Sequence, residues 1–167
     1  MIKKLLLAAV LTLATAVGLS GCSNADAYSS STPVTNVFDI GTTDLTIAPS
    51  LERVGSGTAY TFDFTNSYAK GVRVFLDITA ETGTATLDVK LQSLDPVSAT
   101  YFDIPGASLD QKSATSGDDT LILYPGIAET ANESVSDVLP LNWRAVATVG
   151  TGASSSFTFS LGGTYLH

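Results

Sequence analysis

The sequence contains few of the residues on which enzyme and metal chemistry most often depend. Its 167 residues include one cysteine and one histidine, and only eight lysines and arginines against sixteen aspartates and glutamates. One cysteine excludes a disulfide scaffold, and a net charge of −8 argues against a groove for nucleic-acid phosphates. The histidine, His167, is the last residue, so a Ser-His-Asp or zinc-hydrolase mechanism would depend on a side chain that we expect to be solvated. We therefore predict no enzyme activity, no cofactor, no metal site and no nucleic-acid partner.

Long apolar runs and helical periodicity are also scarce, which excludes a multi-pass membrane protein and a coiled coil. Apolar residues nevertheless make up 44% of the chain and charged residues 14%, which is too apolar for a disordered chain. The residues from Cys22 onward are enough to bury roughly two thirds of the surface of the unfolded chain. They should fold as one domain without cross-links.

The first 22 residues have the three-part layout of a secretory signal. Lys3 and Lys4 precede an uncharged apolar stretch, residues 5–17, and small residues follow up to Cys22. As a helix this stretch spans about 20 Å, short of the roughly 30 Å hydrocarbon core of a bilayer. We therefore interpret it as a helical signal peptide rather than a permanent transmembrane helix, with the two lysines as part of the recognised signal.

The segment Leu19-Ser20-Gly21-Cys22 resembles the bacterial lipobox. The resemblance implies that a diacylglyceryl group alkylates the Cys22 thiol and that the chain is then cut before this residue. Buried acyl chains contribute about 0.8 kcal/mol per CH₂ and would hold the protein on a bilayer. The next residue is Ser23 and not Asp, which in enteric-type bacteria is similar to a signal for the outer membrane. We predict a lipid-anchored protein on the exported side of the cell membrane or outer membrane; the alternative is an ordinary buried thiol.

The leader divides the chain into three parts. Residues 1–21 are the predicted lipoprotein signal peptide, residues 22–36 a small and polar flexible tether, and residues 37–167 the folded domain. Removal of Lys3 and Lys4 with the leader takes the net charge from −8 to −10, because every acid lies beyond it.

From about Val37 the sequence alternates apolar and polar residues with a period of two, as half-buried strands do. In residues 58–65 the three aromatic side chains fall on one face and polar side chains on the other. Residues 71–79 and 85–92 repeat the alternation around a hairpin-sized connection that contains Gly83. Further strands are predicted at Asp44–Ala48, Thr100–Ile104, Thr120–Tyr124, Trp143–Val149 and Ser156–Leu161, with a last short one at Thr164–Leu166.

About eight short strands at regular spacing predict an all-β fold, an antiparallel β-sandwich or jelly-roll-like single domain after the signal peptide. Only residues 125–142 interrupt the rhythm. Within them Val135, Val138 and Leu139 have the i, i+3, i+4 spacing of a short helix that would cross one end of the sandwich. The alternative is a connection whose apolar residues only cap the core. Long loops often carry function.

Two weaker patterns concern ligands. Tyr101 and Phe102 are adjacent and point to opposite faces of one strand, so one ring could be exposed and stack on a sugar. A second packed layer of the sandwich is the simpler explanation of both rings. The acids of residues 116–119, with Asp95 and Asp103, offer oxygen ligands for Ca²⁺. Their spacing matches no compact calcium loop, and solvated turn acids are the simpler interpretation.

Residues from about 71 to 166 resemble a β-rich virion domain that many tailed phages encode, of the head-decoration or minor structural type. The matching stretches are GVRVFLDITAETGTATLDVKLQSLDPVSATYFDIPGASL, LILYPGIAETANESVSDVLPLNWRAVATVG and SFTFSLGGTYL. The most specific part runs from Tyr124 to Arg144, although Leu141 stands where such proteins usually carry a basic residue. The resemblance implies a structural role without catalytic residues, and capsid or tail proteins as partners.

The leader and this resemblance imply different compartments, because tailed phages assemble in the cytoplasm and an exported, acylated protein leaves it. We expect a non-catalytic, lipid-anchored β-sandwich at the cell surface, a binding or structural module compatible with a phage or prophage origin. It would contact the membrane through the acyl chains on Cys22 and bind an unknown protein or glycan. One alternative is a virion structural protein, a capsid decoration or fibre-type component with an uncleaved N-terminus. The other is a carbohydrate-binding module.

Overall fold

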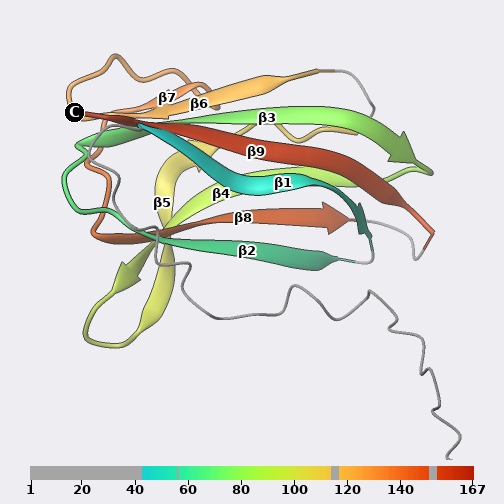
Figure 1. Cartoon of the computed structure of the whole chain (residues 1–167), viewed down its shortest axis with the longest axis horizontal. Helices are drawn as coiled ribbons and strands as arrows, with labels where there is room; N and C mark the ends of the chain where they lie inside the picture. Colours follow the sequence, from blue (N-terminus) through green and yellow to red (C-terminus); the bar gives the residue numbers. More distant parts are fainter. Residues whose placement is uncertain (1–42, 56, 114–116, 151–153) are drawn as a thin grey trace, which may run out of the picture. The chain divides into compact units, whose positions relative to one another are not determined.

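Figure 1 shows the computed structural model of the chain, which describes residues 43–55, 57–113, 117–150 and 154–167. These residues form an all-β structure in which no helix occurs. The strands are β1 (Asp44–Val54), β2 (Thr58–Thr65), β3 (Gly71–Thr82), β4 (Thr86–Asp95), β5 (Thr100–Ser108), β6 (Asp119–Leu123), β7 (Ser134–Val135), β8 (Asn142–Gly150) and β9 (Ser156–Leu166).

The strands form two sheets, with the orders β1-β9-β3-β6-β7 and β2-β8-β4-β5. Apart from the short β7, each strand pairs antiparallel with the strand that mirrors it about the β4–β5 hairpin: β1 with β9, β2 with β8, and β3 with β6. Successive pairs alternate between the two sheets, as in a long hairpin that has been rolled up. This is the topology of a jelly roll, and it confirms the predicted fold class.

The core lies between the two sheets and follows the predicted alternation. In β3 the residues Val72, Val74, Leu76 and Ile78 are buried, whereas Phe75 points outward and is 39% exposed. The largest fully buried side chains are Trp143, Phe157, Phe159, Leu76, Leu87, Leu91, Leu121, Leu123, Leu161, Val72, Val74 and Val149. The interpretation of Trp143 as a core residue is therefore confirmed.

A buried cation lies where the two sheets meet near β1 and β2. Arg53 is only 4% exposed, and its guanidinium lies 4.3 Å from the centroid of the Phe159 ring. It donates hydrogen bonds to three backbone carbonyls, those of Leu51 (3.0 Å), Phe159 (2.9 Å) and Pro49 (3.1 Å). One buried side chain thus bonds to carbonyls of both β1 and β9.

Residues 125–142 contain no helix, so the predicted helix is wrong. Isolated turns occur, such as the one closed by the Ser134 N–H and the Thr130 carbonyl at 2.9 Å, but other backbone groups at the ends of the segment bond to neighbouring segments. The Tyr124 N–H donates to the Val135 carbonyl at 3.0 Å, and the Leu139 N–H donates to the Lys70 carbonyl at 2.9 Å. Pro140 also disfavours the helical conformation at the residue before it. The i, i+3, i+4 spacing arose without a helix.

The other interpretation of this segment, a connection whose apolar residues cap the core, holds for two of the three residues on which it was based. Val135 and Leu139 are 8% and 5% exposed and belong to the core, while Val138 is 58% exposed. Residues Ser134–Val135 form β7, which pairs parallel with β6.

Several strands extend beyond their predicted ends, β1 and β5 by the most, and β9 joins the two pieces predicted at Ser156–Leu161 and Thr164–Leu166. β1 continues past Ala48 to Val54 through two irregularities in its register with β9, one of them around Pro49. β5 continues through Pro105 and Gly106 to Ser108, with a register shift against β4 between Lys90 and Gln92. A bulge breaks the period-two alternation, so the alternating sequence pattern ends before the strand itself ends.

Candidate functional site

The site residues predicted from the sequence fall in two groups. Cys22, the predicted lipidation site, lies outside the described residues, as do the predicted signal residues Lys3, Lys4, Leu19, Ser20 and Gly21. The two aromatic residues Tyr101 and Phe102 lie in β5, an edge strand of the four-stranded sheet.

Four polar residues form a row across the outer face of the four-stranded sheet, which we call the polar row. The strand register places Asp63 opposite Arg144, Arg144 opposite Gln92, and Gln92 opposite Asp103. Arg144 Nε donates to Gln92 Oε1 at 2.7 Å, and Gln92 Nε2 donates to Asp103 Oδ1 at 2.5 Å. Lys90 Nζ donates to the other oxygen of Asp103 at 2.9 Å. Hydrogen bonds therefore join side chains from β8, β4 and β5.

Tyr101 lies against the polar row. The guanidinium carbon of Arg144 is 3.8 Å from the centroid of the Tyr101 ring, a distance at which cation–π attraction operates. Burial raises the pKa of Tyr101, and the negative charge of Asp63 and a hydrogen bond to it raise the pKa further, while Arg144 opposes the rise. Oδ1 of Asp63 is enclosed and accepts no hydrogen bond from the described part of the chain.

The chemistry of the polar row is that of hydrogen bonding. The pKa of Asp103 is lowered by the hydrogen bond from Gln92 and then by the one from Lys90, so Asp103 is an ionised acceptor rather than a proton donor near neutral pH. The row can donate and accept hydrogen bonds with an uncharged ligand that carries hydroxyl groups.

Phe102 does not share a surface with Tyr101. It is paired with Ser93 and points to the face opposite to Tyr101, with 55% of the residue exposed. In addition, the Arg144 guanidinium covers one face of the Tyr101 ring. The two rings therefore do not form one continuous platform for a sugar.

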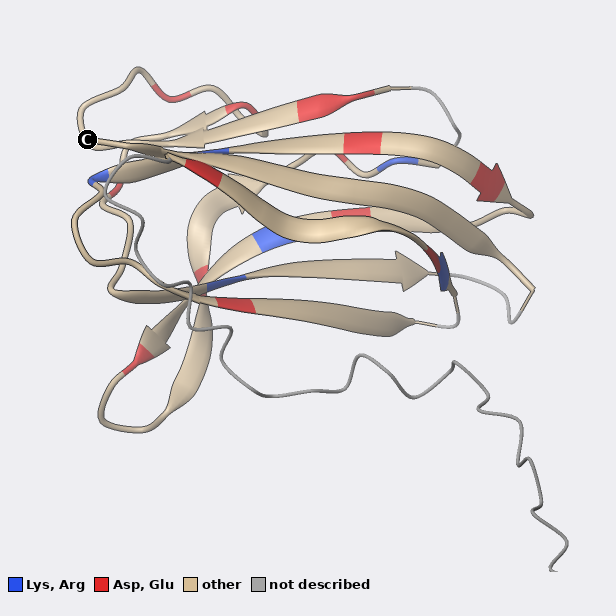
Figure 2. Ribbon diagram, in the orientation of Figure 1, with Lys and Arg blue, Asp and Glu red and all other residues tan. Residues whose placement is uncertain are grey.

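The acids considered as calcium ligands are engaged separately. Asp119 forms an ion pair with Lys112 at 2.7 Å, and Asp95 accepts a hydrogen bond from Ser98 Oγ at 2.6 Å. Among the described residues no group of three His, Cys, Asp or Glu side chains could hold a metal ion. Figure 2 shows that the acidic residues are spread along both sheets and their connections rather than gathered in one place.

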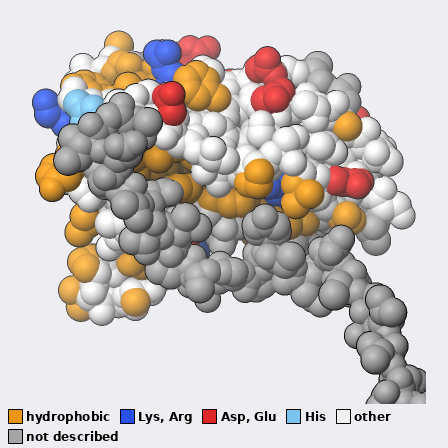
Figure 3. Space-filling model, viewed as in Figure 1, with side chains coloured by type: hydrophobic (Ala, Val, Ile, Leu, Met, Phe, Trp, Pro, Cys, Tyr) orange, Lys and Arg blue, Asp and Glu red, His pale blue; other side chains and the backbone are white. Residues whose placement is uncertain are grey.

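The most exposed large apolar residues gather at one end of the sandwich. The exposed fraction is 92% for Val97, 77% for Tyr68, 64% for Leu141 and 58% for Val138. They lie in the connections β2–β3 (residues 66–70), β4–β5 (96–99) and β7–β8 (136–141), and we call these three connections with their four side chains the apolar loop end. Hydrophobic side chains are visible along this end of the molecule in Figure 3, on the left.

Two of these connections are held together by a buried amide. Asn66 is 7% exposed, and its side-chain nitrogen donates to the carbonyls of Ala69 (2.9 Å) and Leu139 (3.1 Å). Its backbone N–H donates to the Leu141 carbonyl at 2.6 Å. The exposed side chains of Tyr68 and Leu141 therefore project from loops that are bonded to each other.

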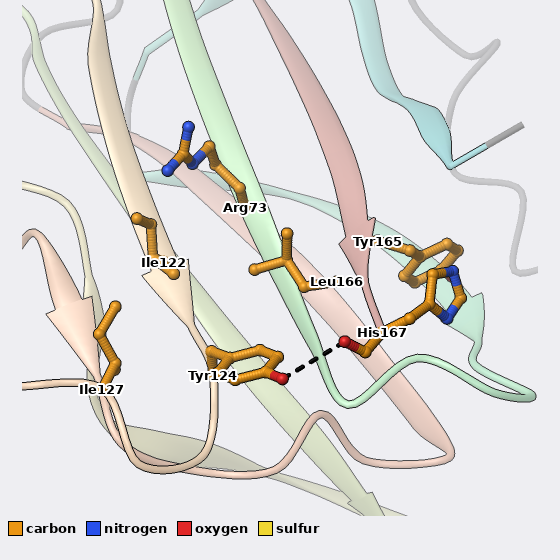
Figure 4. A pocket seen from close by; sticks show the side chains of 7 residues that line it. All are labelled: Arg73, Ile122, Tyr124, Ile127, Tyr165, Leu166 and His167. Carbon is orange, nitrogen blue, oxygen red and sulfur yellow. Dashed lines mark hydrogen bonds between the residues drawn. The ribbon is translucent and has the colours of Figure 1, made fainter.

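A depression of about 440 Å³ opens near the same end, between strands β3, β6 and β9. It is lined by Arg73, Ile122, Tyr124, Ile127, Tyr165, Leu166 and His167 (Figure 4). The Tyr124 hydroxyl donates to the backbone carbonyl of His167 at 3.3 Å, which closes one side of it. The lining is mainly apolar and includes none of the ligand residues predicted from the sequence.

Comparisons of the chain with protein-family models, with curated proteins and with solved structures found no match. The resemblances to the lipobox and to tailed-phage virion proteins therefore stay predictions. The described residues include no helix that is long and apolar enough to cross a bilayer.

Sequence reasoning missed the polar row and the apolar loop end. Alternation places Asp63, Gln92 and Arg144 on outward faces, but only the strand order brings them side by side. A signal existed for the loops: Val97 and Leu141 both lie next to proline, in segments with turn character, where an apolar side chain has no core to face.

Proposed function

We propose that this protein is a lipid-anchored, non-catalytic β-sandwich on the exported side of a bacterial membrane, where it acts as a binding or structural module. The observation that carries the proposal is the order of its parts. An apolar leader is followed by a cysteine in a lipobox-like segment, and a jelly roll begins with β1 at Asp44. A thioether-linked diacylglyceryl group on Cys22 would supply the anchor, because acyl chains hold a protein on a bilayer by burial of CH₂ groups.

The spacing between the anchor and the domain suits this role. Residues 23–43 separate Cys22 from β1, and a fully extended chain of that length reaches at most about 70 Å. Most of these residues are small or polar. A tether of this length permits the domain either to touch the bilayer or to stand away from it.

The described surface supports binding rather than catalysis. The polar row offers carboxylate, amide and guanidinium groups on a sheet face, and the apolar loop end offers exposed side chains. Both surfaces belong to the same jelly roll, a fold that serves many unrelated functions, so the fold itself assigns none of them.

Metabolic labelling with a fatty-acid analogue tests the anchor. We expect label on the wild-type protein and on a matched Ser23→Ala variant, and none on Cys22→Ala. Mass spectrometry of the purified protein should find a modified Cys22 as its first residue. Label on all three proteins, or on none of them, would contradict the proposal.

A virion protein is the second candidate, because the jelly roll is a frequent fold of capsid proteins and the sequence resembles tailed-phage virion domains. In that case protein from its natural source would keep residues 1–21 and would copurify with particles. A carbohydrate-binding module is less well supported, since Tyr101 and Phe102 do not form one platform. Glycan-array binding that Tyr101→Ala abolishes would favour it.

A further inference from the structure

We propose that the apolar loop end docks on the lipid surface to which Cys22 anchors the chain. Tyr68, Val138 and Leu141, with Val97 at the tip of the β4–β5 hairpin, would enter the interfacial region of the bilayer. The inference rests on the proposed lipid anchor and adds to it an orientation and a second membrane contact.

Exposed apolar side chains are concentrated at this end of the domain. The four residues of the apolar loop end are the four most exposed large apolar residues of the described chain, at 58% to 92%. Isolated exposed apolar residues need no explanation, but several at one end of a domain mark an interaction surface. They project from connections between strands, so they could enter a bilayer without disturbing either sheet.

The net charge of the apolar loop end differs from that of the rest of the chain. The connections 66–70, 96–99 and 136–141 contain one basic residue, Lys70, and one acidic residue, Asp137. They are therefore neutral together, although the predicted mature chain carries −10. Asp95 beside the hairpin tip and Arg73 near the same end add one charge of each sign. Anionic lipids of bacterial membranes repel an acidic surface, but they do not repel an end whose charges balance.

The chain enters the folded domain at Thr43, just before β1. The Thr43 carbonyl accepts a hydrogen bond from the Tyr165 N–H at 2.7 Å, next to the pairing of Asp44 with Thr164. This is the end of the strands at which β2, β4 and β6 finish and β3 and β8 begin (Figure 1). The tether from Cys22 thus reaches the domain at its apolar loop end, so docking there does not require the chain to pass along the sandwich.

The experiment anchors the mature chain, which begins at Cys22, to vesicles independently of cellular lipidation. The sequence has no other cysteine, so a maleimide lipid in phosphatidylcholine vesicles couples at this position alone. The reference is the same protein capped with N-ethylmaleimide in solution. Hydrogen exchange is then measured at hydrogen-bonded amides of the loops, those of Ala69, Val97 and Leu139.

We expect exchange at these three amides to slow by roughly tenfold on the vesicles, because a docked end excludes water from them. The Gly55 amide, bonded to the Ser155 carbonyl at the other end of the sandwich, should not change. The variant Val138→Ser/Leu141→Ser should lower the ratio of docked to free domain by roughly 10- to 100-fold and abolish the protection. Val54→Ser, which changes a residue 49% exposed at the opposite end, is the matched control and should keep it.

The outcomes separate the two proposals. Unchanged exchange in the loops of the anchored protein, or equal slowing at Gly55, would overturn the docking inference even if Cys22 is acylated in cells. Slowing in the capped protein that grows with its concentration would assign the apolar loop end to a second copy of the chain and also overturn it. Absence of fatty-acid label in cells would overturn the proposed anchor, while protection on the maleimide vesicles would still establish affinity of this end for lipid. Circular dichroism verifies that each variant is folded.

Discussion

The buried guanidinium of Arg53 offers the sharpest test of how the domain is held together. Replacement by alanine removes hydrogen bonds to three carbonyls, each with a net contribution of about 1 kcal/mol, and leaves a cavity that costs about 2–3 kcal/mol. The desolvation of the guanidinium is also removed, which offsets part of the loss. We expect Arg53→Ala to lower the free energy of unfolding by about 4 kcal/mol.

Arg53→Met separates packing from hydrogen bonding. Methionine fills most of the space of the arginine stem but satisfies no carbonyl, so we expect a loss of about 2 kcal/mol. Arg73→Ala is the control, since Arg73 is exposed on β3 and its replacement should stay within about 0.5 kcal/mol of wild type. Urea unfolding can be followed by the fluorescence of Trp143, the sole tryptophan, and by circular dichroism. If both Arg53 variants match Arg73→Ala, the hydrogen bonds do not stabilise the fold.

Three further predictions concern the polar row and the packing of β3. Asp103 has a pKa below its ordinary 3.8, so its contribution to stability is present above pH 3.8 and is lost as the pH falls through the lowered pKa. In urea unfolding, Asp103→Asn should lower the free energy of unfolding by less than about 1 kcal/mol at pH 7 and should leave it unchanged at acid pH. Asp63→Asn should bring the pKa of Tyr101 closer to 10.0 in an ultraviolet titration, and an unchanged titration would show that the carboxylate does not act on the ring. Gly71→Ala would place a methyl group against the Leu123 carbonyl, and we expect the free energy of unfolding, measured by thermal unfolding, to fall by about 2–3 kcal/mol. A fall of less than about 0.5 kcal/mol would mean that β6 moves aside at little cost.

The period-two pattern predicted most of the sandwich because a sheet with one buried face repeats every second residue. The inward residues of β3 and the burial of Trp143 followed from it directly. The pattern failed where the backbone leaves that period: at the irregularities of β1 around Pro49, at the bulge in β5, and in residues 125–142, where apolar residues at helical spacing cap the core from an irregular segment.

The candidate site was less predictable, since it depends on contacts between strands far apart in the sequence. Alternation along each strand can assign outward positions to Asp63, Gln92 and Asp103. It does not say which strands are neighbours in a sheet. Only the placement of β8 between β2 and β4 brings Arg144 to both Asp63 and Gln92. In contrast, the proposed anchor at Cys22 rests on a local sequence motif and needs no tertiary information, although this residue lies outside the described residues.

The central position of β9 determines when the domain can fold during synthesis. This strand, the last one described, forms ladders with β1 on one side and β3 on the other, so the five-stranded sheet cannot close before β9 has been synthesised. Strand pairs this distant in sequence also form slowly. A ribosome-bound chain therefore stays unfolded until β9 has emerged, which is the state that the proposed export through a channel for unfolded polypeptide would require.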